Sequence, residues 1–233
     1  ATQEIEARVA WWHDDSTVTN TTWLRDAAGN PVWSGLVKDG ARQFSVPSNA
    51  FAPSTRDEAH RQLGATWKTK HAKGWNASVV ATDYVIQSDA ARQANLAQPL
   101  ADLGGAGTVT RRDGTGWNTF EVQTTYTPSE GDFGNGRHAL VLGLHRNQYT
   151  LQNVVNNAPD WRGAETTQNQ NYYGKTTITA LYAQDAWKLH PDWMLTTGLR
   201  FENFESFDGS QYFAGPPVAQ KAFGSRTLTA TSP

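Results

Sequence analysis

The stretch LYAQDAWKLHPDWMLTTGLRFEN, at residues 181–203, predicts a tight antiparallel hairpin. Two runs of alternating apolar and polar residues flank the tripeptide HPD at 190–192, and proline and aspartate are typical turn residues. Because successive side chains of a strand point to opposite faces, Leu199 and Phe201 fall on one face of the returning strand and Arg200 on the other. The returning strand is therefore expected to have one apolar and one charged face.

Period-two patterning or a β-rich composition recurs in seven segments of the chain. They are residues 3–13, 60–70, 75–88, 116–127, 138–149, 175–189 and 193–207. In the fourth segment Phe120 and Val122 share an apolar face, whereas Glu121 lies on the polar face. Asp83 and Asp185 interrupt the apolar sets of their segments, so the sequence leaves those two faces unassigned.

The composition favours strands and excludes several classes of function. Of 233 residues, 38% are hydrophobic, and 10 Trp and 20 Gly give a profile typical of strands and turns. A formal net charge of -2 provides no field that would attract nucleic acid. The absence of cysteine excludes disulfides, thiolate zinc sites and a cysteine nucleophile. No apolar run approaches the roughly 20 residues of a membrane-spanning helix, so any membrane crossing must use strands.

The connections between the segments alternate between short and long. The short ones, at 71–74, 129–137 and 190–192, are rich in Gly, Pro, Asp and Asn. The long ones are residues 14–59, 89–115 and 150–174. Loops beyond about 12 to 15 residues are uncommon in compact domains. Outer-membrane barrels, in contrast, have short periplasmic turns and long external loops.

Aromatic residues gather beside the short connections, where a membrane barrel places an interfacial girdle. They are Trp67, Trp75, Tyr126, Trp187 and Trp193. The sequence therefore predicts an all-β fold, a partial antiparallel transmembrane β-barrel with long extracellular loops, in which half of each strand lines an aqueous interior. The alternative is an ordinary antiparallel β-sandwich whose tryptophans form the core.

Two stretches resemble the TonB-dependent outer-membrane receptors. Their barrels commonly carry a strand like LYAQDAWKL, a tight turn like HPDW and a returning strand like LTTGLRFENF, which stand here at 181–189, 190–193 and 195–204. The stretch TNTTWLRDAAGNPVWSG at 19–35 is similar to an external loop hairpin of iron-complex receptors in this family. These motifs are less specific than a catalytic signature, but with the alternating connections they cover most of the chain.

The resemblance implies a barrel of about 22 strands with an N-terminal plug domain inside it. The family takes up ferric siderophores, cobalamin or sometimes sugars with energy from the inner-membrane TonB complex. Residues 1–233 are then expected to be a fragment of such a barrel, about seven strands long, without the plug domain and the C-terminal strands. Contact with the TonB complex would run through the missing plug region, and the outer face would contact outer-membrane lipid.

The resemblance also implies that external loops grip the ligand with aromatic and cationic side chains, by stacking and charge-assisted hydrogen bonds. The candidates are Trp23, Arg25, Trp33, Arg111, Arg112, Trp161, Arg162, Tyr172 and Tyr173. For each of them, packing within a loop is the alternative role. Arg200 and Glu202 are expected to meet the plug domain or interior water, or to belong to a cross-strand ion network.

Entry motifs of common enzyme classes are absent from the sequence. HExxH, GxSxG and GxxxxGK[ST] do not occur, and the GGAG run at 104–107 has no lysine placed to hold a phosphate. The residues His13, Asp14 and Asp15 could hold a cation, but a strand end that meets a loop explains them more simply. The sequence therefore predicts no catalytic residues, no metal site and no cofactor.

The predicted function is an outer-membrane receptor of a Gram-negative bacterium that binds and imports a ferric siderophore or similar scarce nutrient, energised through TonB. A passive porin is the alternative within transport. A soluble β-sandwich that binds carbohydrate is the alternative outside transport, and a barrel hydrolase that uses Asp and His is a third.

Overall fold

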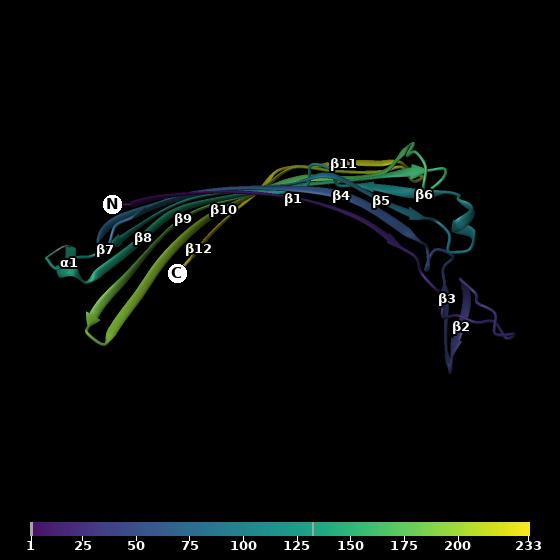
Figure 1. Cartoon of the computed structure of the whole chain (residues 1–233), viewed down its shortest axis with the longest axis horizontal. Coiled ribbons are helices and arrows are strands. Elements are labelled where there is room, and N and C mark those ends of the chain that lie inside the picture. Colours follow the sequence, from purple (N-terminus) through teal and green to yellow (C-terminus); the bar gives the residue numbers. More distant parts are fainter. Residues whose placement is uncertain (1, 132) are drawn as a thin grey trace.

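One curved antiparallel sheet forms most of the structure (Figure 1), a computed structural model that describes residues 2–131 and 133–233. Its strands are β1 (Thr2–Val18), β4 (Ser54–Lys70), β5 (Gly74–Ala94), β6 (Gly107–Arg111), β7 (Gly116–Thr127), β8 (His138–Ala158), β9 (Gln168–His190), β10 (Trp193–Phe213), β11 (Ala219–Phe223) and β12 (Arg226–Ser232). A second, two-stranded sheet pairs β2 (Gly35–Asp39) with β3 (Arg42–Val46). The helical elements are η1 (Leu100–Leu103) and α1 (Phe133–Gly136).

Neighbouring strands of the large sheet pair antiparallel in nearly sequential order. β5 pairs with β6 at one end and with β7 along the rest of its length, and both β6 and β7 continue the sheet to β8. In the same way, β10 pairs with β11 at one end and with β12 further down. The pairs β6 with β7 and β11 with β12 thus each act as one long strand with a short interruption.

The three connections predicted to be short lie at one end of the sheet, which we call the turn end, and the other end is the loop end. Figure 1 shows the β9–β10 turn and α1 at the turn end, and β2, β3 and β6 at the loop end. The turn that contains α1 has left-handed backbone at Gly134 (φ 64°) and Asn135 (φ 59°), which glycine and asparagine adopt most readily. The predicted sidedness therefore holds for these three turns, whereas the short link 214–218 between β10 and β11 lies at the loop end.

The strand register gathers apolar side chains on one face of the sheet. One row across this apolar face consists of Val79, Val122, Leu144, Leu181 and Phe201. All five aromatic residues predicted for the girdle share this face, and we call them the aromatic rim. The opposite face, the polar face, carries charged side chains such as Glu121 and Arg200.

The sheet is a single layer, so the β-sandwich alternative is wrong. A sandwich buries the inner faces of two sheets against each other. Here the apolar face is uncovered, with Ile5 at 79% and Val9 at 76% exposure. A water-soluble protein rarely leaves so many large apolar side chains on one continuous surface, whereas a lipid-facing barrel wall must do so. The partial transmembrane β-barrel is the fold that fits.

The two faces that the sequence left unassigned are now determined. Asp83 and Asp185 both lie on the apolar face, and each has a basic partner. The carboxylate of Asp83 accepts a hydrogen bond from Arg61 at 3.1 Å, and that of Asp185 lies 2.7 Å from Nδ1 of His138. His138 and His145 are on opposite faces, as their odd separation predicts.

The strands are longer toward the loop end than the sequence patterns predicted. β8 continues to Ala158 and β9 begins at Gln168, so the connection expected at 150–174 shrinks to residues 159–167. The other two long connections contain strands of their own, β2 with β3 and then β6. The reason is that polar side chains occur on both faces of these strand ends, which interrupts the alternation although the backbone ladder continues. The prediction that a strand ends near His13 is also wrong, since β1 runs to Val18. There too, polar residues beyond His13 give no alternating pattern.

Among the described residues, no helix is long and apolar enough to cross a membrane.

Candidate functional site

Four aromatic rings line up across β1, β4, β5 and β7 on the polar face, near the loop end. We call them the aromatic row: Trp12, His60, Tyr84 and Trp117. The rings of Trp12 and His60 stack at 4.8 Å between centroids with 4° between their planes. Tyr84 and Trp117 stack at 4.0 Å and 26°, and Tyr84 lies 5.7 Å from His60. The row is one continuous aromatic surface built from four strands.

Hydrogen bonds fix the middle of the row and leave its ends accessible. Nδ1 of His60 lies 2.6 Å from the hydroxyl of Tyr84, and its Nε2 lies 3.0 Å from Glu58. His60 is only 6% exposed, whereas Trp12 is 41% and Trp117 is 44% exposed. Rigid, partly exposed indole rings are suited to stacking on a ligand, because little conformational freedom is lost on binding.

An ion cluster borders the aromatic row on the side of the loop end. Its centre is Asp89, whose side chain is fully buried. Arg56 donates two hydrogen bonds to Asp89, from Nε at 3.1 Å and from Nη2 at 2.9 Å, and Arg112 lies 3.3 Å away. Glu58 joins the cluster through Arg56 at 2.6 Å. These four residues, Arg56, Glu58, Asp89 and Arg112, are the ion cluster.

A β-bulge brings Asp89 to the polar face. The pairing of β4 with β5 shifts between Ala59 and His60, which leaves Gln87 without an opposite residue. Because a bulge inserts one extra residue, every side chain beyond it changes face. Simple alternation from Tyr84 would place Asp89 on the opposite face, toward lipid or outer solvent. The bulge instead pairs Asp89 with Glu58 and sets it beside Arg56.

The charge of Arg56 is reinforced by its partners. The hydrogen bond to Asp89 raises the pKa of Arg56, and this outweighs the lowering that burial causes. The side chains of Arg56 and Arg112 are 35% and 39% exposed, so both guanidinium groups remain partly open to solvent while one buried carboxylate holds them. Such groups can offer charge-assisted hydrogen bonds to an anionic ligand.

Three connections at the loop end pack into a small core around Trp161, which is 3% exposed. The core residues are Ala52, Ala94, Ala101 and Trp161. Nε1 of Trp161 donates to the carbonyl oxygen of Ala101 at 3.0 Å, and its backbone N–H donates to Gly105 at 2.8 Å. This loop core therefore joins residues 47–53, 95–106 and 159–167.

Polar contacts attach residues 159–167 to the strands below. Arg92 donates to the carbonyl oxygen of Gly163, and Arg111 pairs with Glu165 at 2.8 Å. Asn156 also donates to Glu165, at 2.6 Å. Burial alone would raise the pKa of Glu165, but the hydrogen bonds from Asn156 and Arg111 bring it below its ordinary value. Glu165 is thus held as a carboxylate that ties the loop to β6 and β8.

The nine predicted ligand-binding residues fall into separate places. Three of them lie in the connection 19–53. The rings of Trp23 and Trp33 meet Phe51 edge-on at 6.4 and 6.1 Å, and Trp23 is 66% exposed. Arg25 donates to the backbone carbonyl oxygens of Thr22 and Leu24. The structure thus brings Trp23 and Trp33 together in one aromatic cluster.

The other six predicted residues belong to the strands and to the loop core. Arg112 is part of the ion cluster, Arg111 pairs with Glu165, and Trp161 is buried. Arg162 lies over the ring of Trp161 at 4.8 Å and 3.7 Å from Asp102. The ring of Tyr172 meets that of Phe213 edge-on, with 5.6 Å between centroids. The amino group of Lys175 lies 5.6 Å from the centre of the Tyr173 ring. Tyr172 and Tyr173 point to opposite faces of β9.

Deeper on the polar face, a second hydrogen-bonded network surrounds Tyr182. Its hydroxyl donates to Glu121 at 3.1 Å and accepts from Gln123 at 3.0 Å. The ring lies against Gly143, where an added Cβ atom would collide with it. Arg200 lies 5.7 Å from the same ring and pairs with Glu202 at 2.6 Å, so this ion pair lies within β10 and does not cross between strands.

The aromatic row and Asp89 were not predicted from the sequence. Each member lies in a different strand, and only the pairing register brings them together. Counting back from the short connection at 71–74 could have placed Tyr84 near His60, but the bulge that positions Asp89 has no signal in the sequence. Among residues 2–131 and 133–233, no group of three or more His, Asp or Glu side chains could hold a metal ion.

The chain matches a known protein family. A family model described as "TonB dependent receptor-like, beta-barrel" matches residues 10–233. No curated protein and no solved structure matches the chain.

Proposed function

The chain belongs to the TonB-dependent receptor-like β-barrel family, whose members are receptors and transporters of the Gram-negative outer membrane, and we propose that it imports a ferric siderophore or a similar scarce nutrient. This is a family of transport proteins rather than of enzymes. In such barrels the turn end is periplasmic and the loop end is extracellular. The polar face is then the inner wall, and the apolar face contacts lipid.

The observation that carries the proposal is the aromatic row beside the ion cluster, on the inner wall above the membrane. A siderophore offers flat conjugated groups that can stack on Trp12 and Trp117. It also offers anionic oxygens that can accept hydrogen bonds from Arg56 and Arg112. A passive porin needs an open polar passage, not a stacked aromatic surface with fixed cations beside it, so this arrangement favours a receptor.

The predicted loop residues complete the proposed site. Trp23, Arg25 and Trp33 would close over the ligand from the connection 19–53, since Trp23 is largely exposed. The contribution of Trp161 and Arg162 would be to hold the loop core in shape, as both already have partners there. Arg111, Tyr172 and Tyr173 remain proposed ligand contacts at the extracellular strand ends.

We propose further that the sheet is one part of a closed barrel. In the part of the chain that the structure describes, β1 has a partner strand on one side only. An open edge in hydrocarbon leaves backbone groups unsatisfied at several kcal/mol each, so further strands must pair with it in the membrane. A plug domain inside that barrel would couple the receptor to the TonB complex.

Uptake measurements test the proposed function. The full-length receptor, expressed in a Gram-negative host without its own siderophore receptors, should restore growth on a ferric siderophore under iron limitation. The restoration should disappear when TonB is deleted. Growth that is restored equally without TonB would identify a passive pore instead, and no restoration with any ferric siderophore would contradict the iron-complex substrate.

Two variants on neighbouring residues test the site itself. Trp12→Ala removes one end of the aromatic row and should weaken ligand binding about fivefold, as expected for one aromatic contact. Trp11→Ala is the matched control, because Trp11 is 62% exposed on the opposite face of the same strand. Equal effects of both variants on affinity would contradict a role for the row.

A further inference from the structure

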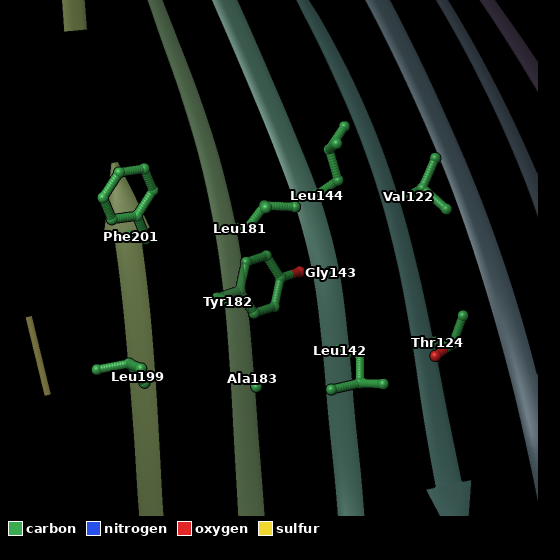
Figure 2. Close-up of a pocket in the computed structure, with 10 residues that line it drawn as sticks. All are labelled: Val122, Thr124, Leu142, Gly143, Leu144, Leu181, Tyr182, Ala183, Leu199 and Phe201. Atoms are coloured by element: carbon green, nitrogen blue, oxygen red, sulfur yellow. The ribbon is translucent and has the colours of Figure 1, made fainter. Parts of the chain in front are cut away.

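An apolar groove runs across the outer face of β7, β8, β9 and β10 (Figure 2), with a volume of about 520 Å³. Figure 2 shows the leucines of β8 and β9 and Phe201 bordering the hollow. The groove is shallow and open, and the small side chains Ala183 and Thr124 stand in it among these larger ones. Its lining residues are Val122, Thr124, Leu142, Gly143, Leu144, Leu181, Tyr182, Ala183, Leu199 and Phe201.

The groove has defined upper and lower borders. Toward the periplasm, Trp187 and Trp193 of the aromatic rim lie on the same face of β9 and β10. Toward the outside, the outer face becomes polar two residues beyond the lining, at Arg146, Thr179 and Asn203. The groove therefore lies at the depth of acyl chains, and its upper border lies at the depth of lipid headgroups in the outer leaflet.

Arg146 stands directly above the groove, two residues from Leu144 on the same face of β8. Its side chain is exposed, and its cross-strand neighbours are Phe120 and Thr179. Within the described residues no ion pair or side-chain hydrogen bond engages its guanidinium group. A cation at the edge of hydrocarbon with no protein partner is stabilised by an anionic headgroup.

A second groove on the same face provides a contrast. It is lined by Ala7, Arg8, Val9, Leu63, Gly64, Ala65, Ala81, Thr82 and Asp83, with a volume of about 320 Å³. The cation above it, Arg61, pairs with Asp83 at 3.1 Å. The protein itself therefore neutralises the charge at this groove, whereas the charge of Arg146 is left for a ligand.

We propose that the groove and Arg146 form one binding site for an anionic, phosphate-bearing lipid of the outer leaflet. One acyl chain fills the groove and the phosphate accepts hydrogen bonds from the Arg146 guanidinium group. The same lipid molecule is then held in two ways, by charge-assisted hydrogen bonds to its phosphate and by burial of its acyl chain. The site is separate from the inner wall and does not depend on which nutrient is imported.

The first test compares two arginine variants of the full-length receptor in detergent micelles, with lipid retention measured by native mass spectrometry. Arg146→Gln should retain phosphatidylglycerol about fivefold less than the unaltered protein, the factor that corresponds to one cation at an anionic surface. Arg61→Gln should retain it unchanged, and Arg146→Lys should keep most of the binding. Unchanged retention by Arg146→Gln, or equal losses in both glutamine variants, would overturn the proposal.

The second test addresses the acyl chain. Ala183→Phe fills the groove without changing the charge and should reduce retention of phosphatidylglycerol, whereas Ala81→Phe in the second groove should not. Competition with inorganic phosphate separates the headgroup from the whole lipid. Complete displacement by free phosphate would show that Arg146 binds only the ion, and would contradict the combined site. Heat-modifiable gel migration of each variant confirms that its barrel is folded.

Discussion

The two halves of each long strand belong to one continuous sheet, but their side chains meet different surroundings. One half contacts lipid on its outer face, and the other is surrounded by water. In the periplasmic half of β9, Leu181, Ala183 and Trp187 face lipid, with Asp185 beside them held by His138, and Tyr182 and Gln184 face the interior. In the extracellular half, from Gln168 to Lys175, polar side chains occupy both faces. The antiparallel pairing continues through both halves, with register shifts in the extracellular half between Phe207 and Ser210 and between Val155 and Asn156. The comparison teaches that lipid imposes a repeating pattern, whereas water above the membrane leaves stability to specific contacts.

The largest expected effect tests whether the extracellular half depends on one specific contact. Trp161→Ala removes the centre of the loop core, and truncation of a buried Trp costs about 3 to 5 kcal/mol where the site cannot collapse. Amide hydrogen exchange should therefore accelerate in residues 95–106 and 159–167 together. Exchange in the membrane-depth part of β9 should stay unchanged. Acceleration in only one of the two connections would show that they do not form a joint core.

The next effect tests the repeating pattern of the periplasmic half. Val122→Arg places a cation among lipid chains and should cost about 2 to 4 kcal/mol near the bilayer centre. Asn118→Arg, four residues further toward the loop end on the same face of β7, should cost little, because its two cross-strand neighbours, Asp83 and Gln148, are polar. Denaturant unfolding of the receptor in lipid vesicles measures both variants. Similar costs for the two would contradict the division into halves.

A smaller effect is expected at the ion cluster. Asp89→Asn keeps the size of the side chain but removes the charge that holds Arg56 and Arg112, and hydrogen bonds to charged groups contribute about 1.5 to 3 kcal/mol. The variant should weaken binding of an anionic ligand and lower stability near the bulge. Asp113→Asn is the control, since Asp113 accepts the backbone N–H of Asp89 without contacting either arginine in the described network. Ligand affinity and hydrogen exchange of β5 distinguish the two.

The smallest effect concerns pH. The pKa of Glu165 is lower in the folded protein than its ordinary value of 4.5, so its contribution to stability is complete above that value. The contribution is lost as pH falls through the folded pKa, when the carboxylate that Arg111 and Asn156 contact becomes protonated. The protection of residues 159–167 should therefore differ between the unaltered protein and Glu165→Gln at neutral pH, and the difference should vanish in acid. A difference that persists in acid would exclude charge as its cause.

The periplasmic half could be predicted from the sequence because lipid and water enforce alternation there. Val122 and Glu121 reveal their faces by type alone, and the short connections fix the ends of the strands. The extracellular half could not, since residues such as Asn171 and Tyr172 carry no period-two signal although they extend β9.

The candidate site was predictable only in part. Arg112 was expected among the ligand-binding residues and lies in the ion cluster, but its partner Asp89 changes face at a bulge that depends on the pairing of two strands. The aromatic row is likewise a property of register, since Trp12 and Trp117 are far apart in the chain. Residue type and spacing reveal single strands, whereas a site assembled across four strands requires their relative alignment.

The contact between Tyr182 and Gly143 sets how much room the passage offers. Because Gly143 has no side chain, the tyrosine ring can recline across the neighbouring strand instead of standing upright into the passage. A larger residue at position 143 would displace the Tyr182 ring away from β8 and toward the interior of the barrel. The absence of a side chain at Gly143 thus leaves the space that the Tyr182 ring occupies.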